Sequence, residues 1–486
     1  MFCHKYGPLC CAAFILAVLS CGSLLCSHAK GRIFQKREED PPVQVTLGLS
    51  ADLLEYDDDS RSASSCINEN MLNATTLSAH FRGDICRSSG AHTSAFENTA
   101  TVAQVAQPSE MLVMAYYPDW MGDSFPPSKI DFQRFDWIDF AFAVPKADAS
   151  LAWDDPVSGP TLLEELVTSA HSHNSYVKLS IGGWTGSRYF STIVSTEKGR
   201  SKFAENILAT YNKFSLDGID IDWEYPGQEG SPGNKYNSKD TANFLLFLQK
   251  LRSTLPPSAR ITAAVESTPF VDNKGKPLKD LTEFAEVLDW VLIMNYDVWG
   301  SSSNPGPNAP LYDACGNSTQ PDASAVGAFN AWTRANFPAS KLVLGLPSYG
   351  YISSSKAQHL RTRSNKGAED SSGFKVKNDD GDSEGQVQFR ELIKQGVLVP
   401  TSDDRGYPTY AASEGFETLW DGCSETPYIR STSSGQIITY DSPLSLGMKA
   451  AFAKKVGMLG VNVFDVHGDT DTWDLVDSVR RALDLT

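Results

Sequence analysis

The chain carries little positive charge for its length and has no basic tract, with 42 Lys and Arg against 59 Asp and Glu in 486 residues. Its formal net charge of −17 repels phosphate backbones, so no nucleic-acid partner is expected. Long apolar runs are also scarce: there is one, which excludes a protein with several membrane spans. Apolar residues nevertheless make up 41% of the chain and aromatic residues 10%, which excludes wholesale disorder. These features predict a large, acidic, soluble protein with a sizeable core.

The single long apolar run lies near the N-terminus, from Pro8 to Cys26, and follows Lys5. Small residues come next at Ser27 and Ala29, the −3 and −1 positions of a cleavage site. This layout is that of a secretory signal peptide over residues 1–29, which predicts a secreted protein without stable membrane association after cleavage. The alternative is an uncleaved signal anchor, because the run is almost long enough to span a bilayer.

The cysteines agree with secretion. Five of the nine lie in the predicted signal peptide, and no two of the others are close enough for the C-x-x-C pair of a zinc site. An even number then remains, which suggests two disulfides in an oxidising compartment. These four are Cys66, Cys86, Cys315 and Cys423. Of the three pairings we favour Cys66–Cys86 with Cys315–Cys423, since the first two share a separate segment.

Two further patterns bear on processing. Lys36 and Arg37 precede an acidic stretch and form either a dibasic cleavage site or a solvated charge cluster. Asn-x-Thr triplets begin at Asn73 and Asn317, so we expect a glycoprotein if the chain is secreted.

The composition divides the chain near Met111. Residues 30–109 lack sustained hydrophobic periodicity and are expected to form a largely irregular polar leader or propeptide. From residue 110 to 486, short apolar runs alternate with amphipathic stretches. The eight runs are Met111–Tyr117, Ile138–Val144, Tyr176–Ile181, Gly218–Trp223, Ile261–Val265, Trp290–Asn295, Lys341–Leu346 and Met458–Phe464. The clearest helices are Thr161–Ser172, Gly199–Phe214, Asp240–Thr254 and Ser324–Phe337.

Near-continuous apolar runs are typical of parallel strands covered on both faces, and eight of them alternating with helices predict an α/β fold, the (β/α)8 TIM barrel. A doubly wound open sheet is the alternative, weakened because no glycine-rich phosphate loop follows the first strand. About residues 351–440, between the seventh and eighth strands, the spacing is too long for one helix. We expect an inserted α+β subdomain there, forming one wall of a cleft.

The strongest chemical signal is a row of acids on the fourth predicted strand. Because side chains alternate between faces, Asp220, Asp222 and Glu224 share one face, while Ile219, Ile221 and Trp223 share the other. In a barrel the acids would point inward, where like charges and poor solvation disfavour ionisation. The arrangement predicts that Glu224, at the C-terminal end, stays protonated near neutral pH as a general acid. The alternatives are a divalent-metal site and a solvent-facing acidic edge strand.

Asp217, Asp220, Asp222 and Glu224 fit the D-x-x-D-x-D-x-E signature of glycoside hydrolase family 18, which holds chitinases and related endo-N-acetylglucosaminidases, and the chain resembles that family elsewhere too. Ser180–Gly183 resembles its S-x-G-G motif and Met294–Asp297 its M-x-Y-D motif. Tyr116–Trp120 and Lys341–Gly350 look like its first and seventh strands. The similarity runs from about Met111 to the C-terminus, and the leader is outside it.

The resemblance implies a retaining reaction in which the substrate's own 2-acetamido oxygen attacks C1, without cofactor or metal. Glu224 would protonate the glycosidic oxygen and then activate water. Asp222 would orient the acetamido N–H, Asp220 would share a proton with Asp222, and Tyr296 would donate a hydrogen bond to the acetamido oxygen. Asp217 and Gly218 would shape the strand rather than touch substrate.

Further substrate-binding residues follow from the same mapping: Tyr116, Ser180, Gly183, Trp184, Met294, Asn295 and Asp297. Trp120, Trp299 and Trp420 are stacking platforms for sugar rings or, equally, ordinary packing residues. Phe464 departs from the family, which commonly has Trp at this position beneath the reactive sugar.

Three functions are compatible with these residues. The first is a secreted chitinase, a monomer acting on chitin or chito-oligosaccharides, which the large insertion favours. The second is an endo-N-acetylglucosaminidase on the cores of N-glycans. The third is a chitin-binding lectin, which the presence of both Glu224 and Asp222 disfavours.

Overall fold

The computed structural model describes residues 111–362 and 373–485. The predicted signal peptide, the leader, the dibasic site and the Cys66–Cys86 pair lie outside the described residues. No helix in the described part of the chain is long and apolar enough to cross a membrane.

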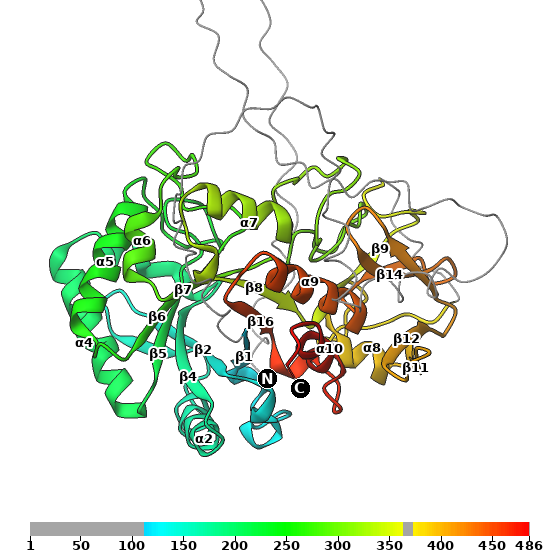
Figure 1. Cartoon of the computed structure of the whole chain (residues 1–486), viewed down its shortest axis with the longest axis horizontal. Coiled ribbons are helices and arrows are strands. Elements are labelled where there is room, and N and C mark those ends of the chain that lie inside the picture. The colour runs from blue at the N-terminus through cyan, green and yellow to red at the C-terminus, as the bar shows by residue number, and fades with distance from the viewer. Residues whose placement is uncertain (1–110, 363–372, 486) are drawn as a thin grey trace, which may run out of the picture. The chain divides into compact units, whose positions relative to one another are not determined.

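Eight parallel strands form a closed barrel (Figure 1). Around the barrel the order is β1, β16, β8, β7, β6, β5, β4, β2, and pairing between β1 and β2 closes it. The strands are β1 (Leu112–Pro118), β2 (Trp137–Pro145), β4 (Tyr176–Gly182), β5 (Gly218–Asp222), β6 (Arg260–Val265), β7 (Trp290–Ile293), β8 (Leu342–Pro347) and β16 (Gly460–Phe464). A short β3 (Leu151–Trp153) pairs antiparallel with β2. The predicted (β/α)8 barrel is confirmed, and the open sheet is excluded by the β1–β2 pairing.

Helices cover the outside of the barrel. They are α2 (Gly159–Ser172), α3 (Phe190–Val194), α4 (Glu197–Phe214), α5 (Asp240–Thr254), α6 (Thr282–Val287), α7 (Ala325–Arg334), α9 (Pro443–Lys455) and α10 (Asp474–Ala482). Local sequence sets their starts: the side chains of Thr196 and Ser324 accept the backbone N–H at the third helical residue of α4 and α7, and Ser442 forms a capping box with Ser445. The four helices expected from the sequence are present, with α7 ending three residues early, close to Asn336, which has a positive φ.

The hydrophobic core has two layers. The outer layer lies between strands and helices and contains Ile219, Ile221 and Trp223 of the acid strand and its extension. The inner layer fills the barrel and includes Met114, Tyr116, Trp137, Ala141, Ala264, Trp290, Leu292 and Val343. The alternation expected along β5 is therefore observed, with the isoleucines outward and the acids inward.

The base of the barrel is filled by a buried lysine. Lys178 Nζ lies 2.8 Å from Asp139 Oδ1, and the ammonium group also lies over the rings of Trp290 (4.7 Å) and Trp137 (5.2 Å). Asn462 donates to the other oxygen of Asp139 at 2.8 Å. Gly218 leaves room for this lysine, because a Cβ there would stand 3.0 Å from its side chain and 2.6 Å from a backbone oxygen of β6.

The chain between β8 and β16 forms a mostly antiparallel unit. Five strands are ordered β10, β9, β15, β14, β13, and β11 pairs with β12 in a separate hairpin. Their bounds are β9 (Tyr349–Ser354), β10 (Gly385–Gln388), β11 (Leu398–Ser402), β12 (Pro408–Ala412), β13 (Glu417–Asp421), β14 (Thr426–Ser431) and β15 (Gln436–Thr439), with α8 (Phe389–Lys394) among them. A disulfide between Cys315 and Cys423 ties the turn after β13 to the segment between β7 and α7, which confirms that predicted pairing.

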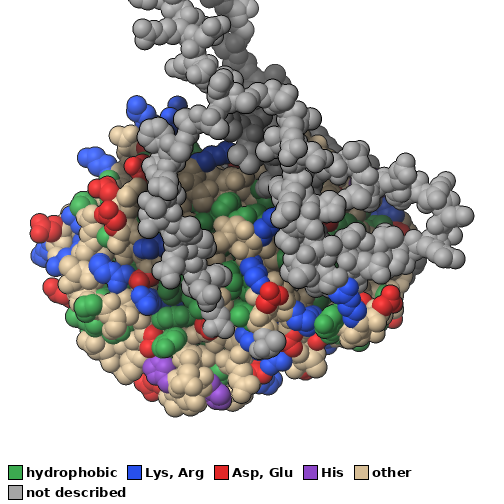
Figure 2. All heavy atoms as spheres, viewed as in Figure 1, with side chains coloured by type: hydrophobic (Ala, Val, Ile, Leu, Met, Phe, Trp, Pro, Cys, Tyr) green, Lys and Arg blue, Asp and Glu red, His purple; other side chains and the backbone are tan. Residues whose placement is uncertain are grey.

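Figure 2 shows one face of the molecule. Where side chains are coloured on that face, acidic and basic residues are interspersed and form no large patch of one sign.

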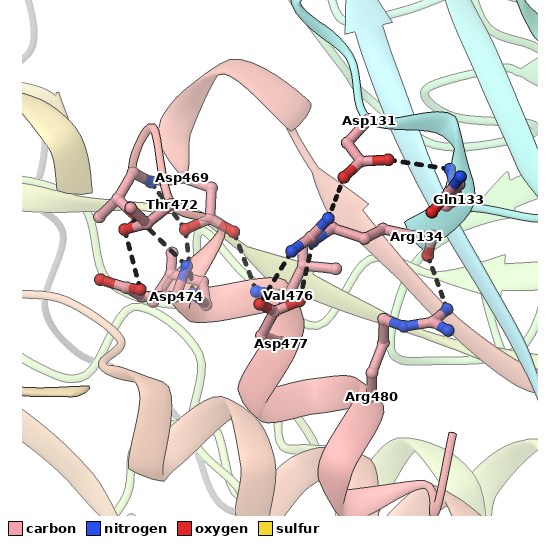
Figure 3. A network of polar contacts seen from close by, with 11 residues as sticks. Asp131, Gln133, Arg134, Asp469, Thr472, Asp474, Val476, Asp477 and Arg480 are labelled. Carbon is pink, nitrogen blue, oxygen red and sulfur yellow. Dashed lines mark hydrogen bonds and ion pairs between the residues drawn. The ribbon is translucent and has the colours of Figure 1, made fainter. Parts of the chain in front are cut away.

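The last helix is tied to the segment before β2 (Figure 3). Arg134, in the 3-10 turn Phe132–Arg134, donates from Nε and a terminal nitrogen to the two carboxylate oxygens of Asp477, at 2.8 and 3.1 Å. The side chain of Arg480 donates to the backbone oxygen of Arg134 at 3.1 Å. Asp469, which is fully buried, accepts the backbone N–H of Thr470, Leu475 and Val476 at 2.7 to 2.9 Å. This carboxylate therefore organises the first turn of α10.

Replacing Asp469 by Ala is expected to lower the free energy of unfolding by about 2–3 kcal/mol, because buried N–H groups lose their acceptor. Asp471→Ala is a matched control: its side chain is 93% exposed and pairs with Arg390 at 3.3 Å, so the loss should stay within about 0.5 kcal/mol. Urea unfolding followed by tryptophan fluorescence measures both. Equal midpoints for the two variants would contradict the role given to Asp469.

Candidate active site

The acid row lies at the carboxyl end of the barrel, where barrel enzymes place their active sites. Asp220 and Asp222 belong to β5 and Glu224 follows it; their side chains are buried, with exposures of 1%, 4% and 9%. Because β5 lies between β4 and β6, it is not an edge strand, and that alternative is wrong. In the described residues no three His, Cys, Asp or Glu side chains are arranged to hold a metal ion.

Asp220 is the most fully bonded of the three acids. Its Oδ2 accepts hydrogen bonds from the hydroxyls of Tyr116 (2.9 Å) and Ser180 (2.8 Å), and its Oδ1 accepts one from Thr262 (2.6 Å). The donors come from β1, β4 and β6, so three strands hold this carboxyl group in one orientation. Tyr116 and Ser180, expected to bind substrate, are engaged here with Asp220.

Asp222 is the least compensated acid. Its Oδ1 is buried and has no hydrogen-bond partner among the described residues. Burial raises the pKa of Asp222 well above its usual range, and the nearby charges of Glu224 and Asp220 raise it further. An unpartnered buried oxygen can accept an N–H from a bound molecule without first losing a protein contact.

Glu224 is held by its backbone at the mouth of the barrel. Its N–H donates to Ser187 Oγ at 2.9 Å, and its carbonyl accepts from Asn234 Nδ2 at 3.3 Å. Burial raises the pKa of Glu224 to about 7, with contributions from the charges of Asp297 and Glu266, against a lowering hydrogen bond from Tyr225. A carboxyl group with such a pKa can both give and take a proton near neutral pH.

The two glycines of the S-x-G-G motif allow β4 to approach the acid strand. Gly182 has φ +122°, and a Cβ there would lie 2.0 Å from the carbonyl oxygen of Asp222. Gly183, with φ +82°, donates its N–H to the same oxygen at 2.9 Å. Both positions therefore require glycine. Gly183, expected to bind substrate, thus contacts β5, the strand that carries the acids.

Asp217 lies at the opposite end of β5 from Glu224. Its Oδ2 accepts the backbone N–H of Val177 at 2.8 Å and lies 2.8 Å from His171 Nε2. It thus links β5 to β4 and α2 at the base of the barrel, away from the mouth, in keeping with the strand-shaping role expected for it.

Aromatic rings line the interior below the mouth. Phe464 has ring-centroid distances of 5.3 Å to Tyr116, 5.8 Å to Tyr296 and 6.2 Å to Tyr349. Burial and the charge of Asp222 raise the pKa of Tyr296 well above its usual range, so its hydroxyl remains a donor at neutral pH. Phe464 therefore occupies the floor among three tyrosines, as its place in the sequence predicts.

The segment after β7 is fixed by its own polar contacts. Asp297 accepts hydrogen bonds from the hydroxyls of Tyr349 and Tyr351, both at 2.7 Å, and donates its N–H to Asn308 at 2.8 Å. Asn295 is buried and donates to Pro310 O at 3.3 Å, so its amide group secures this loop. Met294 packs against the inner core layer.

The four tryptophans expected near the site, Trp184 and the three considered as platforms, differ in exposure. Trp120 and Trp184, directly after β1 and β4, are each 49% exposed, which leaves ring surface open at the carboxyl end of the barrel. Trp299 is half-buried against Gly306, where a Cβ would come within 2.4 Å of the ring. Trp420, on β13 of the insertion, donates from Nε1 to Glu425 at 2.8 Å. The first two present the more open faces.

Sequence reasoning missed Ser187, Asn234 and Glu266. Ser187 and Asn234 bond to the backbone of Glu224, and Asn234 also donates to Trp184 O at 2.8 Å. Serine and asparagine in polar loops carry no distinguishing pattern. Glu266 could have been found by extending the strand after Val265 by one residue.

Three comparisons bear on this geometry. The family model described as Glycosyl hydrolases family 18 matches residues 112–469. The chain is 35% identical over 406 residues to a "chitinase-like effector" of Moniliophthora roreri, with 79% of this chain and 96% of that protein covered. It is 27% identical to "Chitotriosidase-1" of Mus musculus, with 67% of each covered.

A solved chitinase structure from Rhizomucor miehei superposes with a TM-score of 0.65 at 31% identity, covering 76% of this chain and 99% of that one. The family model spans most of the chain, and the acid row lies where that family's signature requires it. The chain therefore belongs to the glycosyl hydrolases of family 18.

Proposed function

We propose that this protein is a secreted chitinase that hydrolyses β-1,4 linkages between N-acetylglucosamine units with retention of configuration. The observation that carries the proposal is the pair at the mouth of the barrel. Glu224 has a pKa near neutrality, and below it Asp222 presents a buried, unpartnered oxygen. The relatives named as chitinases support the choice of substrate.

In the first step Glu224 donates its proton to the glycosidic oxygen as the bond from C1 to that oxygen breaks. The 2-acetamido oxygen of the same sugar forms a bond to C1, which gives an oxazolinium ion and the free leaving alcohol. Asp222 accepts the acetamido N–H and stabilises the positive charge, and Tyr296 donates to the acetamido oxygen.

In the second step Glu224, now ionised, takes a proton from water while the water oxygen attacks C1 and the ring of the oxazolinium opens. Two displacements at C1 retain the configuration. Substrate assistance is favoured because Asp220 and Asp222 lie beneath Glu224 on one strand, so neither can attack from across the sugar.

Two other functions remain as outcomes of the test. An endo-N-acetylglucosaminidase acting on N-glycan cores would use the same acid and the same acetamido group. A chitin-binding protein without turnover is the second candidate, because the Moniliophthora roreri relative carries the name "chitinase-like effector". Because both Asp222 and Glu224 are present, catalysis is favoured over binding without turnover.

The test is to express the 486-residue chain and assay medium and cell extract separately with chitin hexamer and with a high-mannose glycoprotein. We expect hydrolysis of the hexamer by the medium, with the β-anomer formed first in NMR time courses, and intact glycans. Initial α-anomer would contradict retention, glycan release alone would support the second function, and calorimetric binding without products would support the lectin. Activity confined to the extract would overturn secretion.

A further inference from the structure

A second carboxyl group, Glu266, lies beside Glu224 at the rim. β5 and β6 pair in parallel, with Ile221 opposite Ala263 as the last paired residues. Glu224 and Glu266 each follow three residues later, so continuing the register brings them to the same level on neighbouring strands. Such strands are about 4.8 Å apart. Side chains alternate between the two faces of a strand, so Glu266 lies on the same face as Thr262, four residues earlier. That face points into the barrel, because the hydroxyl of Thr262 donates to Asp220.

Two contacts fix Glu266 in place. Gln228, in the loop that follows the acid strand, donates from Nε2 to Glu266 Oε2 at 2.7 Å. Trp332 of α7, which is fully buried, donates from Nε1 to the backbone oxygen of Glu266 at 3.1 Å. Gln228 therefore fixes the carboxyl group of Glu266 to the loop that follows Glu224, and Trp332 fixes the backbone of Glu266 to α7.

A small cavity adjoins Glu266 and Gln228. It has a volume of about 10 Å³, room for one water molecule, and Trp223, Tyr225, Gln228, Ala264, Glu266 and Phe270 contribute to its lining. Apart from the carboxyl and the amide, its walls are mainly aromatic and apolar. Charges act over longer distances in such surroundings than in water, because little solvent screens them.

The titratable groups that face Glu224 are acidic or phenolic. They are Asp222 on β5, Tyr225 next to Glu224 in the chain, Glu266 after β6, and Tyr296 and Asp297 after β7. Burial raises the pKa of Glu266 itself, while the hydrogen bond from Gln228 lowers it and so favours the charged form. The charge of Glu266 raises the pKa of Glu224 and also that of Tyr225.

We propose that Glu266 is a positioning residue that acts through Glu224: its carboxylate, fixed by Gln228 at the neighbouring strand end, holds Glu224 in the protonated form that begins each turnover. This rests on the proposed function, in which Glu224 is the acid. The sign follows from charge repulsion. A negative neighbour opposes loss of the proton, so Glu224 keeps it to higher pH with Glu266 present than without.

The test compares Glu266→Gln with Glu229→Gln, a matched control that removes one carboxylate from an exposed position of the same loop. Glutamine at 266 can still accept from Gln228, so the packing is kept and only the charge is lost. The protonation of Glu224 is read by NMR of ¹³C-labelled Glu carboxyl carbons across pH, with Glu224→Gln identifying its signal. We expect a roughly threefold or larger fall in proton affinity for Glu266→Gln and none for the control.

Glu266→Asp keeps the charge and should leave the proton affinity of Glu224 near that of the wild type. An unchanged affinity in Glu266→Gln, or an equal fall in Glu229→Gln, would overturn the proposal. The readout does not need turnover, so the two proposals fail separately. If the wild type cleaves no chitin but the affinity falls, only the proposed function is lost. If it cleaves chitin, the alkaline limb of kcat/KM should move to lower pH in Glu266→Gln alone.

Discussion

Replacing Glu224 by Gln is expected to lower kcat on chitin oligosaccharides by about three orders of magnitude, the middle of the range for removal of a general acid–base group. Glutamine has nearly the same shape but cannot donate a proton to the glycosidic oxygen or take one from water. Because the backbone contacts of Glu224 to Ser187 and Asn234 do not involve its carboxyl group, the site should keep its form.

Initial rates with chitin hexamer, together with calorimetric binding of the same oligomer, check this expectation. Binding should remain within a few-fold of the wild type, and Glu229→Gln should have normal kcat. Turnover in Glu224→Gln close to that of the wild type would refute the assignment of the acid.

Asp222→Asn is expected to lower kcat by about a hundredfold, the cost of removing one group that stabilises charge in the transition state. Asparagine can still accept the acetamido N–H through its oxygen, but it carries no negative charge against the oxazolinium. The substitution also removes a like charge beside Glu224 and so favours loss of its proton, an effect that measurement at several values of pH separates from the loss of charge stabilisation.

Asp217→Asn is the matched control, because Asp217 belongs to the same signature and lies at the other end of β5. Its oxygen accepts from Val177, a contact that asparagine can keep, so kcat should stay within about twofold. Both variants are compared on chitin hexamer at several values of pH. Equal losses for Asp217→Asn and Asp222→Asn would mean that the strand, and not the charge at its mouth, governs the rate.

Much of the fold and the acid row could be predicted because both depend on short-range periodicity. Ile219, Ile221 and Trp223 alternate with Asp220, Asp222 and Glu224, so one strand predicts which side chains meet the helices and which meet the barrel interior. The disulfide Cys315–Cys423 followed from the separation of the cysteines into two groups.

The contacts of the site could not be predicted in the same way, because they join residues that only the closed barrel brings together. Asp220 takes its donors from three other strands, the nearest of them 40 residues away along the chain. Glu266 becomes a neighbour of Glu224 through the register of β5 and β6, which no local pattern encodes. The bonds that the hydroxyls of Tyr116 and Ser180 donate to Asp220 were likewise not foreseen.

The lysine at the base has a consequence for the path of a polymer. With Lys178, Asp139 and two tryptophans filling its lower half, the barrel interior is closed at the base. In the proposed reaction, a polymer chain therefore reaches the acid row from the carboxyl end of the barrel and does not thread through it.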